Sequence, residues 1–88
     1  MINYMDDPQW GKVVSRYIKS EMAIKGMKYK DLQRALEKLG THQTDANLRQ
    51  KINRGQLSAQ LFLQLLVVLD IQHLELSKIK QIVRHLQS

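Results

Sequence analysis

The sequence contains no cysteine, only one proline and only four glycines among its 88 residues. Without cysteine, neither a disulfide framework nor a thiolate metal site is possible. The longest apolar stretch, residues 61–71, is interrupted by Gln64 and Asp70 and is too short to cross a bilayer. The first ten residues carry two acids and no basic run before an apolar segment, which is unlike a secretory signal. We therefore expect a soluble, cytoplasmic protein.

The charge is strongly one-sided. The sequence has fourteen lysines and arginines but only eight aspartates and glutamates, which gives a formal net charge of +6 and a pI near 9.8. Net charge indicates which partners a protein binds and says little about its fold. A small basic domain most often binds nucleic acid or an acidic surface. The length allows a single domain spanning residues 1–88.

Apolar residues recur at helical spacing in five segments, and no segment alternates with the period of a strand. The pattern predicts an all-α protein, a compact five-helix bundle with helices at about 7–25, 29–39, 45–54, 58–69 and 74–86. Asp7 with Pro8, Thr44 and Ser58 are the expected N-terminal caps. Three of the four glycines, Gly26, Gly40 and Gly55, stand where a helix should end.

The apolar stripes predict how these helices pack. Trp10 and Tyr17 belong to the stripe of the first helix and are expected in the core. Residues 61–69 are apolar nearly all round, which suits a central helix or half of a subunit interface. The fifth helix should pack on the fourth helix or on a second subunit. Its expected stripe is Leu76, Ile79, Ile82, Val83 and Leu86.

The third predicted helix has an unusually polar outer face. Leu48 and Ile52 are four residues apart and must point inward. The other side carries amides and a guanidinium, groups that pair with adenine and guanine edges in the major groove. We predict that four residues of this helix contact bases and that two flanking residues hold phosphates. The expected base contacts are Asn47, Gln50, Asn53 and Arg54, and the flanking phosphate contacts are Arg49 and Lys51. An ordinary solvated face is the competing interpretation.

A second basic cluster surrounds the second predicted helix. It consists of Lys25, Lys28, Lys30, Arg34 and Lys38. Lys30 and Arg34 are the members that we expect to hold DNA phosphates beside the third helix. A solvated helix face explains the same residues equally well, so both interpretations stay open.

Residues 29–71 resemble the helix-turn-helix of the Cro and phage-repressor class, also called the xenobiotic-response-element class. The resemblance is carried by DLQRAL at 31–36, the corner Asn53-Arg54-Gly55, the Ser58 cap and LDI at 69–71. ANLRQKINRG followed by LSAQLFLQLL is also similar to small bacterial helix-turn-helix-like proteins of unassigned function. The resemblance implies a Cro-repressor-like core whose third helix enters the major groove. It further implies that Gln43, Thr44 and Asn47 touch bases or phosphates, with Thr44 as a phosphate contact.

Catalytic and metal-binding patterns are missing from the sequence. There is no phosphate-binding glycine loop and no nucleophile elbow, and the three histidines are scattered. We expect no enzyme, no metal and no cofactor. The sequence predicts sequence-specific binding of double-stranded DNA, as a transcriptional regulator that forms a homodimer through the fourth and fifth helices. The alternative is a protein-interaction module that uses those two helices to bind a partner protein.

Overall fold

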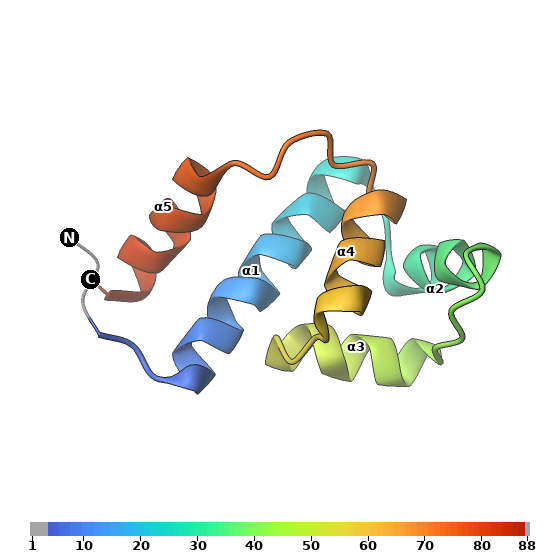
Figure 1. Ribbon diagram of the computed structural model, residues 1–88, viewed down its shortest axis with the longest axis horizontal. Helices are drawn as coiled ribbons and strands as arrows, with labels where there is room; N and C mark the ends of the chain where they lie inside the picture. Colours follow the sequence, from blue (N-terminus) through green and yellow to red (C-terminus); the bar gives the residue numbers. More distant parts are fainter. Residues whose placement is uncertain (1–3, 88) are drawn as a thin grey trace.

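The computed structural model describes residues 4–87, which form five α-helices and no strand (Figure 1). The helices are α1 (Asp7–Lys25), α2 (Tyr29–Lys38), α3 (Asp45–Arg54), α4 (Ala59–Val68) and α5 (Leu76–Gln87). The all-α prediction and the number of helices are confirmed. No helix in the described part of the chain combines the length and the apolar character needed to cross a membrane.

Side-chain caps fix most helix ends where the sequence placed them. Thr44 and Ser58 accept hydrogen bonds from the backbone N–H groups of Asn47 and Leu61, and Gly26 and Gly55 end α1 and α3 in the left-handed conformation. The predicted cap of α1 was wrong by one residue. Asp6, and not Asp7, accepts the N–H of Gln9, whose side chain accepts the N–H of Asp6 in return. This reciprocal pair satisfies two N–H groups that a cap at Asp7 would leave open.

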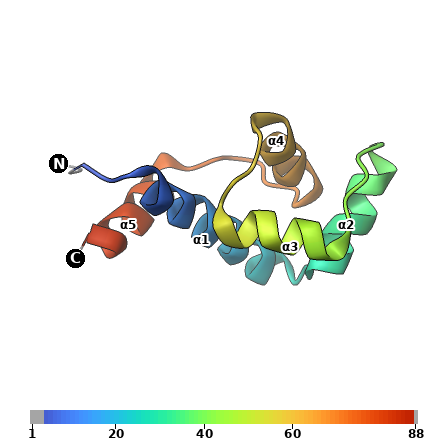
Figure 2. The ribbon, with the colours of Figure 1, turned by 90° about the horizontal axis from the view of Figure 1, so that it is seen from below.

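In the view of Figure 1, the long helix α1 runs between α5, against which it packs, and α4, which reaches α1 through the ring contact of Phe62 with Tyr17. Viewed from below, α3 lies in front of α1, and α2 rises at its side (Figure 2). The predicted packing of α5 on α4 was wrong: α5 packs against α1, and within residues 4–87 the backbones of α4 and α5 do not approach each other. The long linker after α4 carries the chain across the end of α1, which explains why neighbours in sequence are not neighbours in space.

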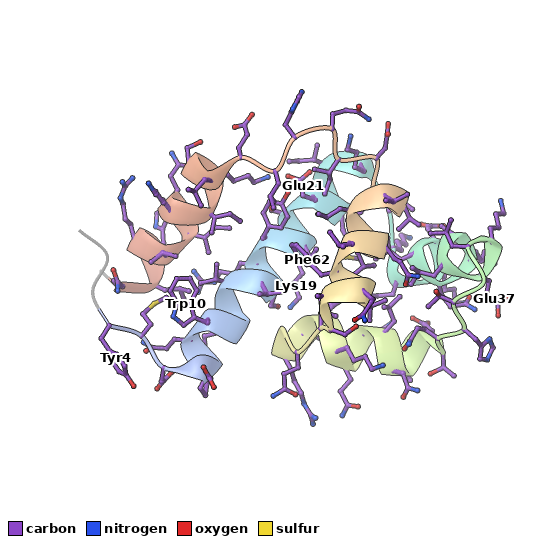
Figure 3. The ribbon with its side chains drawn as sticks, in the orientation of Figure 1. Tyr4, Trp10, Lys19, Glu21, Glu37 and Phe62 are labelled. Carbon is purple, nitrogen blue, oxygen red and sulfur yellow. The ribbon has the colours of Figure 1, made fainter. Side chains whose placement is uncertain are left out.

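One main core joins α1, α2, α3 and α4. Its largest fully buried side chains include Tyr17 and Ile18 of α1, Leu36 of α2, Ile52 of α3 and Leu65 of α4. Phe62 lies between α4 and α1, with its ring centroid 6.5 Å from that of Tyr17 (Figure 3). A second, smaller cluster holds α5 to the start of α1 through Met5, Val13 and Val83.

A polar contact also fastens α5 to α1. The Lys78 ammonium lies 2.5 Å from a carboxylate oxygen of Glu21, on the side of α1 toward the linker and α5 (Figure 3). The same ammonium lies 5.5 Å from the ring centroid of Tyr17. Burial raises the pKa of the Tyr17 phenol above its ordinary value, and the nearby carboxylates of Glu21 and Glu75 raise it further. This phenol therefore stays neutral and adds no charge beneath α5.

Several apolar residues lie outside the core that the sequence predicted for them. Trp10 is 41% exposed, because it lies beside the end of α3 at a hollow that the described helices leave partly uncovered. Leu39 is the C-cap of α2 and half exposed, and α5 begins at residue 76 with Leu76 itself exposed. Helix α4 is not enclosed on all sides, since Leu63 and Val67 face solvent.

Candidate nucleic-acid interface

The outer face of α3 is the most polar exposed helix face beside the main core. Leu48 and Ile52 are fully buried and anchor the helix, as the sequence predicted. All four predicted base contacts are exposed, together with the small residue Ala46, and α3 forms the lower edge of the molecule (Figure 1). These four are Asn47, Gln50, Asn53 and Arg54. The structure thus brings them together on one surface that a groove of DNA could meet.

Two glycines dock the end of α3 directly onto α1. A Cβ atom built at Gly55 would overlap the carbonyl oxygen of Gly11, and one built at Gly11 would lie 2.6 Å from the carbonyl oxygen of Arg54. Gly55 also has a φ of +67°, a conformation that costs other residues energy. Backbone therefore rests on backbone at this point, which fixes the position of α3 relative to α1.

A polar ladder runs along the flank of α3 that faces the start of α2. It consists of Asp45, Arg49 and Asn53, which are spaced four residues apart and so lie on one side of the helix. The Arg49 guanidinium lies 5.0 Å from the ring centroid of Tyr29 and 3.8 Å from an Asp45 carboxylate oxygen. The Tyr29 hydroxyl donates a hydrogen bond of 3.3 Å to Asn53 Oδ1. Tyr29 thus touches two of the predicted DNA contacts.

The opposite flank of α3 faces the turn before it and the start of α4. Lys51 donates a hydrogen bond of 3.2 Å to the side-chain oxygen of Gln43, and Gln64 of α4 donates to the hydroxyl of Thr41. These contacts hold the turn against α3. Lys51 is half-buried, with its ammonium group bonded to Gln43 in the turn before α3.

The remaining predicted phosphate contacts lie beside the polar face. Lys30 and Arg34 are exposed on α2 and line a hollow of about 600 Å³ between α2 and α3. Arg49 lines the same hollow, so three of the predicted cations surround one depression. Thr44 is exposed, and its hydroxyl oxygen already accepts the N–H of Asn47. That contact leaves the hydroxyl proton of Thr44 available as a donor.

Sequence reasoning missed two members of this surface. Tyr29 is the first residue of α2, and its contacts with Arg49 and Asn53 depend on the angle between α2 and α3, which spacing along one helix does not give. Trp10 was placed in the core, whereas it lies half exposed in a hollow that it shares with Arg54 and Gln56. The sequence feature that could have indicated the exposure of Trp10 is Gly11. Because Gly11 has no side chain, the end of α3 lies next to Trp10.

Residues 10–74, which extend from the first turns of α1 to the linker before α5, match the family described as "Domain of unknown function (DUF6471)". No curated protein and no solved structure matches the chain.

Proposed function

The chain belongs to the DUF6471 family, and we propose that it binds double-stranded DNA sequence-specifically as a transcriptional regulator. In this proposal α2, the turn and α3 act as a Cro-repressor-like helix-turn-helix, and α3 enters the major groove. The matched region contains all three of these elements. The family description states no activity, so the proposed function is based on the surface residues of this chain.

The composition of the exposed α3 face is the main support for DNA binding. Amide and guanidinium groups project from a helix that is anchored by two fully buried residues and by the glycine contact with α1. Side chains that contact base edges must be held on a rigid support, since a shift of the helix would misplace all of them together. The side chains of Gln50 and Arg54 make no hydrogen bond or ion pair with any part of residues 4–87, so they are free to meet a base.

The charges around this face suit a polyanion. Lys30 and Arg34 on one flank and Lys51 on the other stand on either side of the base-contacting residues. Two acidic residues, Asp31 and Asp45, line the hollow between α2 and α3, and Asp45 lies 3.8 Å from Arg49, which reduces its repulsion of phosphates. Such flanking cations position a helix on the duplex without specifying the sequence.

We further propose that the protein acts as a homodimer, because a single module of this size makes few base contacts. The sequence suggested α4 and α5 as the interface. Leu63 and Val67, one turn apart on the outer face of α4, supply exposed apolar area, and Leu76 supplies it at the start of α5. Since α4 and α5 lie on opposite sides of α1, the second subunit would contact two separated surfaces (Figure 1).

Selection from a pool of random duplexes tests the function. The purified protein should enrich one motif, with two half-sites spaced by about 34–36 Å if it binds as a dimer. A salt titration on the selected duplex should then show a steep fall in affinity. Sedimentation at micromolar concentration checks the dimer independently, and a pure monomer would exclude it.

Binding without any enriched motif would contradict the proposal, because net charge alone would then explain the affinity. The second candidate, a protein-interaction module that binds a partner through α4 and α5, would account for that result. It is favoured by the exposure of Leu63 and Val67. In that case, a partner protein that binds the unsubstituted protein should not bind the Leu63→Ser variant and should still bind the Gln50→Ala variant.

A further inference from the structure

Asn53 is held by a residue from another helix. Its side-chain oxygen accepts a hydrogen bond from the Tyr29 hydroxyl on the flank toward α2. The amide NH2 group is therefore directed away from α2, and it donates to no other group within residues 4–87. Because Asn53 is exposed, this NH2 group can meet a ligand on the outer face of α3.

The direction of this hydrogen bond has an electrostatic cause. The guanidinium of Arg49 lies 5.0 Å from the centroid of the Tyr29 ring. A positive charge over an aromatic ring favours the arrangement in which the hydroxyl gives its proton away rather than accepting one. The Asn53 oxygen, and not its NH2 group, is consequently the matching partner.

We infer that Tyr29 is a specificity-determining residue, which presents Asn53 to the DNA as a hydrogen-bond donor. The inference rests on the proposed function. An asparagine with both ends free pairs two-handed with adenine, accepting from N6 and donating to N7. The Tyr29 hydroxyl occupies one lone pair of Asn53 Oδ1 and holds that oxygen toward α2, so the group that Asn53 turns toward the groove is its NH2 group, with two donors. Guanine offers two adjacent acceptors, N7 and O6, so Asn53 should favour guanine over adenine.

The substitution Tyr29→Phe tests the inference, because it removes the hydroxyl and keeps the ring that Arg49 contacts. In the random-duplex selection, one position of the motif should lose its preference for guanine over adenine by about fivefold, the value of one hydrogen bond. The other positions should not change. Asn53→Ala should remove the preference at that same position, and adding Tyr29→Phe to it should have no further effect.

Tyr4→Phe is the matched control, since Tyr4 is 91% exposed and lies outside the helices. It should leave the whole motif unchanged. In the free protein, Tyr29→Phe should shift the side-chain amide NMR signals of Asn53, and Tyr4→Phe should not. Those amide signals report the contact without any DNA.

Two outcomes separate the inference from the function on which it rests. If Tyr29→Phe and the unsubstituted protein select the same motif, or if the Asn53 amide signals do not move, Tyr29 does not determine specificity, although the protein binds DNA. If the unsubstituted protein selects no motif at all, the proposed function fails and the inference fails with it.

Discussion

The carbonyl oxygen of Gly11 in α1 occupies the position that the Cβ atom of any larger residue at Gly55 would take. The two glycines are 44 positions apart in the sequence and bring the C-terminal end of α3 into backbone contact with α1. This contact determines where the proposed DNA-binding face stands on the molecule. It also gives each glycine a role that helix propensity alone does not reveal.

Alanine at either glycine should destabilise the protein. Gly55→Ala combines the cost of a left-handed conformation with overlap against backbone, and we expect a loss of about 2–4 kcal/mol in the free energy of unfolding. Gly11→Ala should cost about 1–3 kcal/mol because of the contact with the Arg54 carbonyl. Urea unfolding followed by circular dichroism measures both values.

Gly26→Ala is the matched control for this pair. Gly26 has nearly the same positive φ as Gly55, +66° against +67°, but a Cβ atom there would meet nothing within 4 Å. It should cost only about 1–2 kcal/mol, which is the conformational part alone. Equal losses at Gly26 and Gly55 would show that the backbone contact with α1 adds nothing.

Gly11 shows why the sequence predicted the helices better than their packing. From helix propensity alone, alanine at this position inside α1 should gain up to about 1 kcal/mol. The structure reverses the expected sign, because the neighbour that forbids a side chain comes from α3. The caps Thr44, Ser58 and Gly55 depend on residues close in sequence, and these were predicted correctly. The packing of α5 on α1 depends on the path of a long linker, and it was not.

The cations around α3 should contribute separately to the salt dependence of DNA binding. Lys30→Ala and Arg34→Ala should each lower the slope of log K against log salt by about 0.9, the value for one phosphate contact. The preferred sequence should stay the same, since phosphate contacts carry no direct sequence information. Affinity measured by fluorescence anisotropy at several salt concentrations gives the slopes.

Lys80→Ala provides the control for net charge, because Lys80 is exposed on α5, which does not contact α3. It removes one positive charge like the other two variants and should change the slope little. A slope that falls equally in all three variants would assign the salt effect to overall charge and not to the flank of α3.

Lys78 should stabilise the attachment of α5 to α1. The side chain of its partner Glu21 is only 12% exposed, so Lys78→Met leaves a largely buried carboxylate without its cation. We expect a loss of about 1–3 kcal/mol in the free energy of unfolding, partly restored in the double variant with Glu21→Gln. Lys80→Met, on the exposed side of the same helix, should have little effect. Additive losses from Glu21→Gln and Lys78→Met would contradict a direct coupling.

In the candidate site, as in the fold, features set by residues close in sequence could be predicted, whereas contacts between helices could not. The exposure of Asn47, Gln50, Asn53 and Arg54 follows from the spacing of two buried residues on one helix, so the sequence was sufficient to predict it. The contacts of Tyr29 could not be predicted in this way. They require α2 and α3 to meet at a particular angle, which is set by the whole core and not by either helix.

A pair of arginine substitutions tests whether the α3 face contacts DNA bases. Arg54→Ala and Arg84→Ala remove the same side chain from exposed positions, one at the end of α3 and the other on α5. Affinity for the selected duplex should fall by about 1–3 kcal/mol, roughly 5- to 150-fold, in Arg54→Ala. It should change little in Arg84→Ala. Equal losses in the two variants would contradict the account, because the α3 face would then contribute no more than any other positive charge on the protein.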